Sequence, residues 1–205
     1  FVSLNTFVYS RNPTNDPRLG SYFRMYEGAY VGGDYGNANG AGSNSNLSDY
    51  MKTPDLKGDL ITAAEVHFLL SEAAARGYSV GGTAEAYYNS AIGVSMDEWG
   101  VSATDTAAYL ALTEVAYATA AGDWKQKIGS QKWVAMFNNG FEGWTAWRLL
   151  DLGLNGPVVD GVTLDIPTRF LYPTSEATLN GSQYDSAASA IGGDTKTTKI
   201  FWDVN

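Results

Sequence analysis

Tyrosine rings and asparagine amides concentrate in one stretch of the chain, from Tyr26 to Asp59, which is otherwise rich in glycine, serine and aspartate. Flat rings stack on the C–H faces of sugars, and an amide offers the paired donor and acceptor that sugar hydroxyls need. This composition indicates a carbohydrate platform on a long loop. The alternative is a surface loop whose tyrosines pack down on neighbouring helices and hold it in place. The candidate ligand contacts are Tyr26, Tyr30, Tyr35, Asn37, Asn39 and Tyr50.

Residue types for catalysis or metal binding are sparse. His67 is the only histidine and there is no cysteine, and the sequence contains no HExxH zinc motif, GxSxG nucleophile motif or Walker phosphate loop. Glu142 and Asp151 could form an acid pair, but a helix rises about 13.5 Å between them, beyond the roughly 5 to 9.5 Å of glycosidase carboxylates. A carboxylate paired with Arg148 for helix packing is the favoured interpretation. We therefore expect no enzyme activity, no cofactor and no metal ion.

Charge and hydropathy exclude two further classes of function. The 205 residues are enough for one domain with a real core. A net charge of -9 and a pI of about 4.5 argue against nucleic-acid binding, which needs clustered lysine and arginine. No apolar run of about 18 residues is present, so we expect no membrane-spanning helix. Because the chain begins at Phe1, without Met or a signal peptide, we expect a mature or excised fragment.

Two amphipathic helices joined by a glycine turn form the centre of the predicted fold. Thr62 and Glu65 have the spacing of a capping box, and Gly77 ends the first helix. Thr83 caps a second helix that closes at Gly100. The two should pack as an antiparallel pair with the length of a tetratricopeptide unit, about 34 residues. The stripes that this pairing would bury are Val66, Leu69, Leu70, Ala73 and Ala74 in the first helix, and Ala84, Tyr87, Tyr88, Ala91, Ile92, Ser95, Met96 and Trp99 in the second.

Further helices and a turn-rich end complete the expected all-α architecture. Beyond Gly153 the chain is extended and turn-rich, with a small hairpin around Asp160-Gly161 and a brief helical turn at Ser175-Glu176. The three further helices are predicted from a cap at Thr104 or Asp105 to near Gly122, from about Asp123 to Asn139, and over 141–152.

Several ordered segments resemble the SusD/RagB family of outer-membrane nutrient-binding lipoproteins. They are Asp16-Pro17-Arg18 with the Gly/Tyr loop, LITAAEVHFLLSEAAARG, QKWVAMFNNGFEGWTAWRLL, IPTRFLYPTSEATLN and the Lys199-Ile200-Phe201-Trp202-Asp203 ending. The chain departs from the family pattern after Arg148, where Leu149-Leu150-Asp151 replaces a second arginine and a Gly-x-Pro. The resemblance implies mainly structural roles for Glu65, Glu72, Arg76, Trp133, Glu142, Trp144, Arg148, Arg169 and Tyr172.

The resemblance also implies a fold and a function. The fold would be an α-superhelix of tetratricopeptide-like pairs, forming a single region over 1–205 with a lead-in and loop (1–59), a helical core (60–152) and a turn-rich end (153–205). The N-terminal part of the full protein, with its lipidated anchor, would be absent.

The function would be non-catalytic capture of an oligosaccharide at the cell surface and its delivery to a SusC-like TonB-dependent transporter in the outer membrane. A peptide-binding relative of the same family, or a tetratricopeptide scaffold that binds only protein, are the alternatives.

Overall fold

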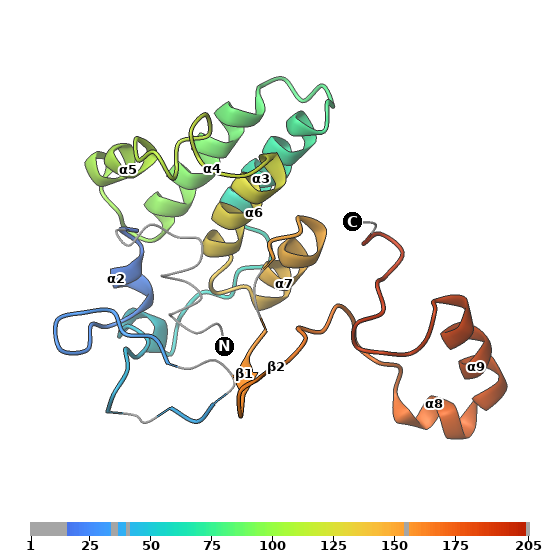
Figure 1. Cartoon of the computed structure of the whole chain (residues 1–205). Coiled ribbons are helices and arrows are strands. Elements are labelled where there is room, and N and C mark those ends of the chain that lie inside the picture. Colours follow the sequence, from blue (N-terminus) through green and yellow to red (C-terminus); the bar gives the residue numbers. More distant parts are fainter. Residues whose placement is uncertain (1–15, 34–36, 40–41, 154–155, 204–205) are drawn as a thin grey trace. The chain divides into compact units, whose positions relative to one another are not determined.

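The computed structural model describes residues 16–33, 37–39, 42–153 and 156–203 (Figure 1). The chain divides into two compact units, Phe1–Leu154 and Asn155–Asn205, and each is described by itself. The described residues are mostly helical, with only two short strands, which confirms the all-α expectation. None of the described helices is both long and apolar enough to cross a lipid bilayer.

Unit 1 is a layer of helices around the predicted pair. The helices α3, α4 and α6 pack against one another, α5 lies on α4, and α7 lies on α6 (Figure 1). The elements of unit 1 are α2 (Leu19–Tyr22), a 3₁₀ turn η1 (Tyr50–Lys52), α3 (Ala63–Ala75), α4 (Ala84–Glu98), α5 (Ala103–Leu110), α6 (Trp124–Ala135) and α7 (Gly140–Leu149).

Side-chain caps explain where the helices of the pair begin. The Thr62 hydroxyl accepts a hydrogen bond from the Glu65 backbone N–H at 3.1 Å, and the Thr83 hydroxyl does the same for Ala86 at 3.1 Å. The Thr62 half of the predicted capping box is therefore present. The Glu65 carboxyl is buried, and burial raises its pKa while the Thr62 backbone acts in the opposite direction.

The third predicted helix is shorter than expected. It is capped by Ser102, not by Thr104 or Asp105, and it ends at Leu110 instead of near Gly122. The Thr119 hydroxyl donates to the Thr113 carbonyl at 2.7 Å in the turns that follow. Side-chain bonds to nearby backbone compete with a continuous helix, so this stretch folds as successive turns.

The buried face of α3 differs from the predicted stripe. Phe68 and Ser71 are fully buried, whereas Val66 and Leu69 are 44% and 45% exposed. Ser71 sits against the first turn of α4 and donates its hydroxyl hydrogen to the Ala84 carbonyl at 2.7 Å. The close approach of α4 and α6 thus selects the face with small and polar residues, and the Val66–Leu69 side is left outward.

The core of unit 1 has two parts. One is a hydrophobic cluster between α3, α4, α5 and α6. The other, here called the aromatic cluster, lies where α2 meets α6 and consists of Leu19, Tyr22, Phe23, Val134 and the partly buried Tyr30, Leu47, Trp99, Trp133 and Phe137. Its rings are closely packed, with the Tyr22 and Phe137 centroids 4.3 Å apart in a stacked arrangement.

A wholly buried ion pair fixes the segment before α2 to the helical layer. The Arg18 guanidinium donates to both Asp16 oxygens, at 3.0 and 2.7 Å, and also to Ser95 of α4 and Gln131 of α6. The Tyr109 hydroxyl of α5 donates to Asp16 at 3.0 Å, and burial raises the pKa of Tyr109, so it stays protonated as a donor. Three helices therefore hold one ion pair.

Unit 2 begins with the predicted hairpin. Strands β1 (Val158–Val159) and β2 (Val162–Thr163) pair antiparallel. Asp160 and Gly161 form the turn at φ values of 51° and 77°, the left-handed pair that two-residue hairpins require. Helices α8 (Thr174–Leu179) and α9 (Gly181–Ala190) follow, and α8 contains the predicted turn at Ser175-Glu176.

Asp194 organises the rest of unit 2. It forms an ion pair with Arg169 and accepts hydrogen bonds from the Tyr172 backbone N–H and the Tyr184 hydroxyl. Burial acts to raise the pKa of Asp194, but these bonds outweigh it and lower that pKa. The Arg169 guanidinium also lies 4.8 Å from the centre of the Tyr172 ring. Arg169 and Tyr172, which the family resemblance marks as structural, therefore take part in one network around Asp194.

Candidate functional site

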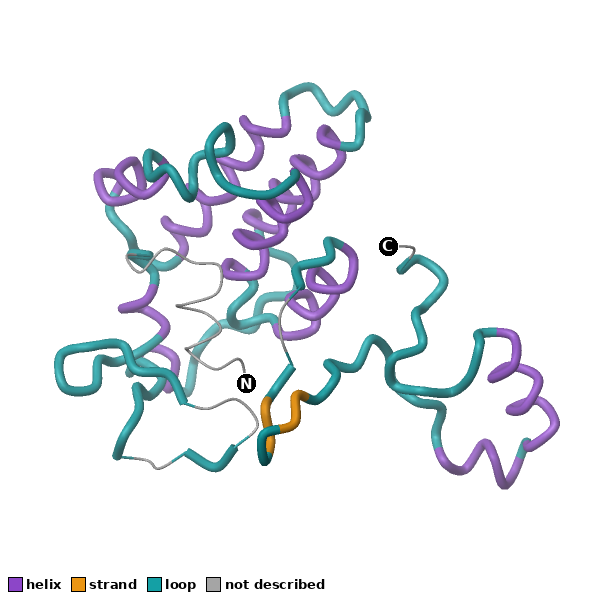
Figure 2. Tube along the Cα trace, in the orientation of Figure 1, coloured by secondary structure: helices purple, strands orange, loops and turns teal. Residues whose placement is uncertain are grey.

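The loop that carries the candidate ligand contacts is closed by hydrogen bonds between its two arms. The Arg24 N–H donates to the Asn46 carbonyl and the Ser45 N–H donates to the Val31 carbonyl, each at 2.8 Å. The Asn44 amide donates to the Gly32 carbonyl at 2.8 Å. The described parts of this long loop, drawn in teal in Figure 2, are therefore held by their own backbone.

Tyr26 and Tyr30 flank a tight turn in the first arm. Glu27 and Gly28 adopt φ values of 48° and 82°, and the Tyr26 and Ala29 backbones bond to each other across them. Both tyrosines are half-buried. Tyr30 packs on the aromatic cluster, and burial raises the pKa of its hydroxyl. Tyr30 thus presents only part of its ring to a ligand and also holds the loop down.

The amide candidates lie on the exposed part of the loop. Asn37 and Asn39 are exposed, and the Asn39 amide donates to the Asn37 carbonyl at 3.0 Å. Asn39 also lies over Gly33, where a Cβ would come within 2.6 Å of its Cγ atom. Glycine at position 33 therefore permits this close approach. Tyr35 lies outside the described residues.

Among the candidate rings that the structure describes, Tyr50 has the most open surface. It is 52% exposed, and its ring meets Trp99 edge to face with centroids 6.0 Å apart. Trp99 in turn meets Tyr22 edge to face at 4.6 Å. Tyr50 is therefore a solvent-facing ring supported by the aromatic cluster, the arrangement that sugar stacking needs.

Two charged residues beside Tyr50 escaped the sequence analysis. Arg24 in one arm and Asp49 at the end of the other form an exposed ion pair at 3.2 Å. A carboxylate and a guanidinium supply acceptors and donors for sugar hydroxyls. Opposite charges at the two ends of the loop were a weak signal, but only the closed loop brings them together. Trp99 was not among the candidate ligand contacts either, because its spacing placed it in the buried stripe of α4.

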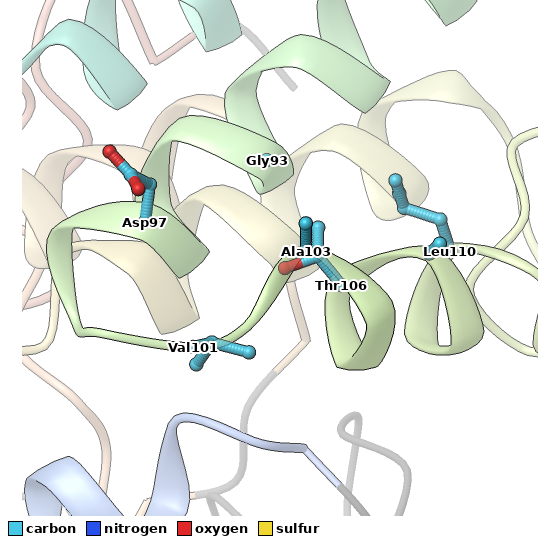
Figure 3. Close-up of a pocket in the computed structure, with 7 residues that line it drawn as sticks. Gly93, Asp97, Val101, Ala103, Thr106 and Leu110 are labelled. Atoms are coloured by element: carbon cyan, nitrogen blue, oxygen red, sulfur yellow. The ribbon is translucent and has the colours of Figure 1, made fainter.

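A separate groove lies between α4 and α5 (Figure 3). It encloses about 260 Å³ and is lined mainly by small and aliphatic residues. Its polar lining consists of Asp97, which is exposed, and Thr106, which is half-buried. It lacks the buried polar groups that orient a ligand in a built site.

Within the described ranges, no three His, Cys, Asp or Glu side chains are grouped as a metal site would require. His67 lies on α3 with its ring centroid 6.3 Å from that of Tyr87. Both residues are half-buried, which fits packing in the helix pair.

The residues assigned structural roles in unit 1 lie at helix contacts. Glu72 of α3 is buried and pairs with Arg76 at 2.9 Å, whose guanidinium lies 5.1 Å from the centre of the Trp124 ring. A further contact lies inside α7, where the Arg148 guanidinium is 3.7 Å from the centre of the Trp144 ring.

Trp133 packs on the aromatic cluster from α6. Glu65 is buried in the first turn of α3, and burial together with the charge of Glu142 raises its pKa.

Comparison with known proteins decides the family. Residues 1–173 match a family model described as SusD-like, "Starch-binding associating with outer membrane". The chain belongs to the SusD-like family. No curated protein sequence matches it.

Solved SusD-like structures share this fold. One described as "Bacteroidetes AC2a SusD-like" is 32% identical, with a TM-score of 0.72 over 82% of this chain and 35% of its own. A chitin-binding protein is 27% identical, with a TM-score of 0.76 over 93% and 47%. A chitin-binding SusD homologue from Flavobacterium johnsoniae is 26% identical, with a TM-score of 0.70 over 99% and 48%. The chain thus spans half or less of the length of these relatives.

Proposed function

We propose that this SusD-like chain captures an oligosaccharide without catalysis and that the sugar stacks on Tyr50. The exposed, supported Tyr50 ring is the observation that carries the proposal. The Arg24–Asp49 pair would bind hydroxyls beside it, and Asn37 and Asn39 would extend the contact along the loop. The family match and the chitin-binding names of two related structures support a glycan as the ligand.

We expect Tyr50→Ala to weaken binding of starch or chitin oligosaccharides by about two- to twelvefold, because one lost ring contact costs about 0.5 to 1.5 kcal/mol. Isothermal titration calorimetry measures the change. Tyr78→Ala is the matched control, since Tyr78 is 68% exposed but lies in the α3–α4 connection. Equal affinities for the two variants, with both folded, would remove Tyr50 from the site.

Delivery to a TonB-dependent transporter is the second part of the proposal. We expect affinity capture of the native protein from detergent-solubilised outer membranes to recover a large TonB-dependent barrel, identified by mass spectrometry. Capture in the absence of detergent-solubilised membranes is the control. Repeated recovery of the protein without any such barrel would contradict delivery to a transporter. Glycan capture would still be tested separately by the calorimetry.

A protein-binding scaffold is the second candidate function, and one observation favours it. The outward side of α3 and the residues before it are apolar, with Leu60 91% and Ile61 72% exposed beside Val66 and Leu69. Such a surface fits a helical protein partner. Recovery of a helical partner in the same capture experiment, with no glycan bound in calorimetry, would put this candidate first.

A further inference from the structure

The negative charge of this protein is concentrated in one part of the chain. Residues 77–124, which include α4 and α5, contain six acidic residues and no lysine or arginine, and so hold -6 of the net charge of -9. All six acidic residues are exposed, and among the described residues none of them belongs to an ion pair. They are Glu85, Asp97, Glu98, Asp105, Glu114 and Asp123. An acidic surface of this kind attracts a cationic partner.

The groove between α4 and α5 lies within this acidic part of the chain. Gly93 and Asp97 of α4 lie on one side of it, and Ala103, Thr106 and Leu110 of α5 lie on the other (Figure 3). Small residues leave the space open. A Cβ atom at Gly93 would meet no atom within 4 Å, so nothing in the protein itself fills this side of the groove.

The interior of the groove offers apolar contacts, and its rim offers a negative charge. The Thr106 hydroxyl donates to the Ser102 carbonyl at 2.9 Å, so its hydrogen is already used within the first turns of α5. The rest of the interior is glycine, alanine, valine and leucine. The Asp97 carboxylate is the charged group of the lining, and Asp97 is exposed to solvent.

Size and charge together select the kind of occupant. The groove encloses about 260 Å³, which is less than the roughly 300 to 1,000 Å³ of pockets for small molecules. A second copy of this chain would bring the same acidic charge and would be repelled. A protein segment with basic residues on both sides of an aliphatic side chain matches both the apolar interior and the acidic rim.

We propose that the α4–α5 groove docks a basic segment of a partner protein. One aliphatic side chain of the segment is buried between Gly93 and Leu110, and a lysine or arginine lies beside Asp97. The groove shares no residue with the Tyr50 site or with the outward side of α3. The proposal therefore does not depend on glycan capture.

NMR titration of the ¹⁵N-labelled whole chain with the peptide acetyl-Lys-Lys-Leu-Lys-Lys-amide tests the docking. We expect saturable shifts of the Gly93, Val101 and Thr106 amide signals, and weaker binding as the salt concentration rises. The same peptide with serine in place of leucine should bind about tenfold more weakly, because its central side chain gains nothing from burial. Equal binding of the two peptides would overturn the proposal in favour of charge attraction alone. Shifts of these signals with protein concentration, without peptide, would overturn it in favour of a second copy.

Two substitutions in the groove test the same contacts from the side of the protein. Gly93→Met places a side chain in the groove without a clash and should weaken binding of the leucine peptide by about tenfold. Gly140→Met is the matched control, since a Cβ at this exposed first residue of α7 also meets no atom within 4 Å. Asp97→Asn should weaken binding by about two- to fivefold at low salt, whereas Asp151→Asn, at another exposed aspartate, should not change it. Unchanged binding in both Gly93→Met and Asp97→Asn would overturn the proposal.

Discussion

Replacing Arg18 with methionine is expected to destabilise unit 1 by about 3 to 5 kcal/mol, the cost of breaking a buried ion pair by removing one partner. The change would remove the buried guanidinium that donates to both oxygens of the buried Asp16 carboxylate. It would also remove the donors to Ser95 and Gln131, so that α4 and α6 would lose a common contact. Equilibrium unfolding in urea, followed by tryptophan fluorescence, measures the loss, because every tryptophan except Trp202 lies in unit 1.

Arg24→Met is the matched control for this prediction. It removes the same side chain from an ion pair whose partners are largely exposed, and such pairs contribute about 0 to 1 kcal/mol. The double variant Asp16→Leu, Arg18→Met should recover part of the stability lost in Arg18→Met, since the buried carboxylate is then absent together with the guanidinium. Similar costs for Arg18→Met and Arg24→Met would contradict the burial of the Asp16–Arg18 pair.

Local chemistry in the sequence predicts where helices begin and end, but it does not predict which charges are buried. Thr62, Thr83 and the two glycines Gly77 and Gly100 act through neighbours within a few residues, and the structure confirms all four boundaries. Arg18 is different. It donates to Ser95 and Gln131 and lies over the Tyr109 ring, and these residues come from three helices distant in sequence. A sequence pattern treats an arginine as exposed by default.

The candidate site shows the same division between residue type and neighbourhood. The sequence identifies Tyr50 as a suitable ring because ring chemistry is visible in the residue itself. Its support by Trp99 and its position beside the Arg24–Asp49 pair depend on loop closure and on the end of α4. Residue type alone does not predict whether a ring is free to stack on a sugar. Tyr30 is a tyrosine of the same loop, but it packs partly into the aromatic cluster.

The orientation of α3 is where the spacing pattern fails, and two substitutions of adjacent residues test it. We expect Phe68→Ala to lower the free energy of unfolding of unit 1 by about 3 to 5 kcal/mol, because it empties a fully buried site in the core. Leu69→Ala should cost under about 1 kcal/mol, since the Leu69 side chain is nearly half exposed. Urea unfolding followed by tryptophan fluorescence measures both values.

The difference between these two costs decides which face of α3 the helical layer covers. A stripe at i, i+3 and i+4 spacing is buried only if a neighbouring helix lies against it, and α3 carries apolar residues on more than one side. Within unit 1, α4 and α6 meet the side of Phe68, where Ser71 donates its hydroxyl hydrogen to the Ala84 carbonyl of α4. A larger cost for Leu69→Ala than for Phe68→Ala would restore the face predicted from spacing and would reverse the orientation of α3. The expected order instead means that the side of α3 that carries Phe68 and Ser71 faces α4 and α6, although the apolar spacing favours the side of Val66 and Leu69.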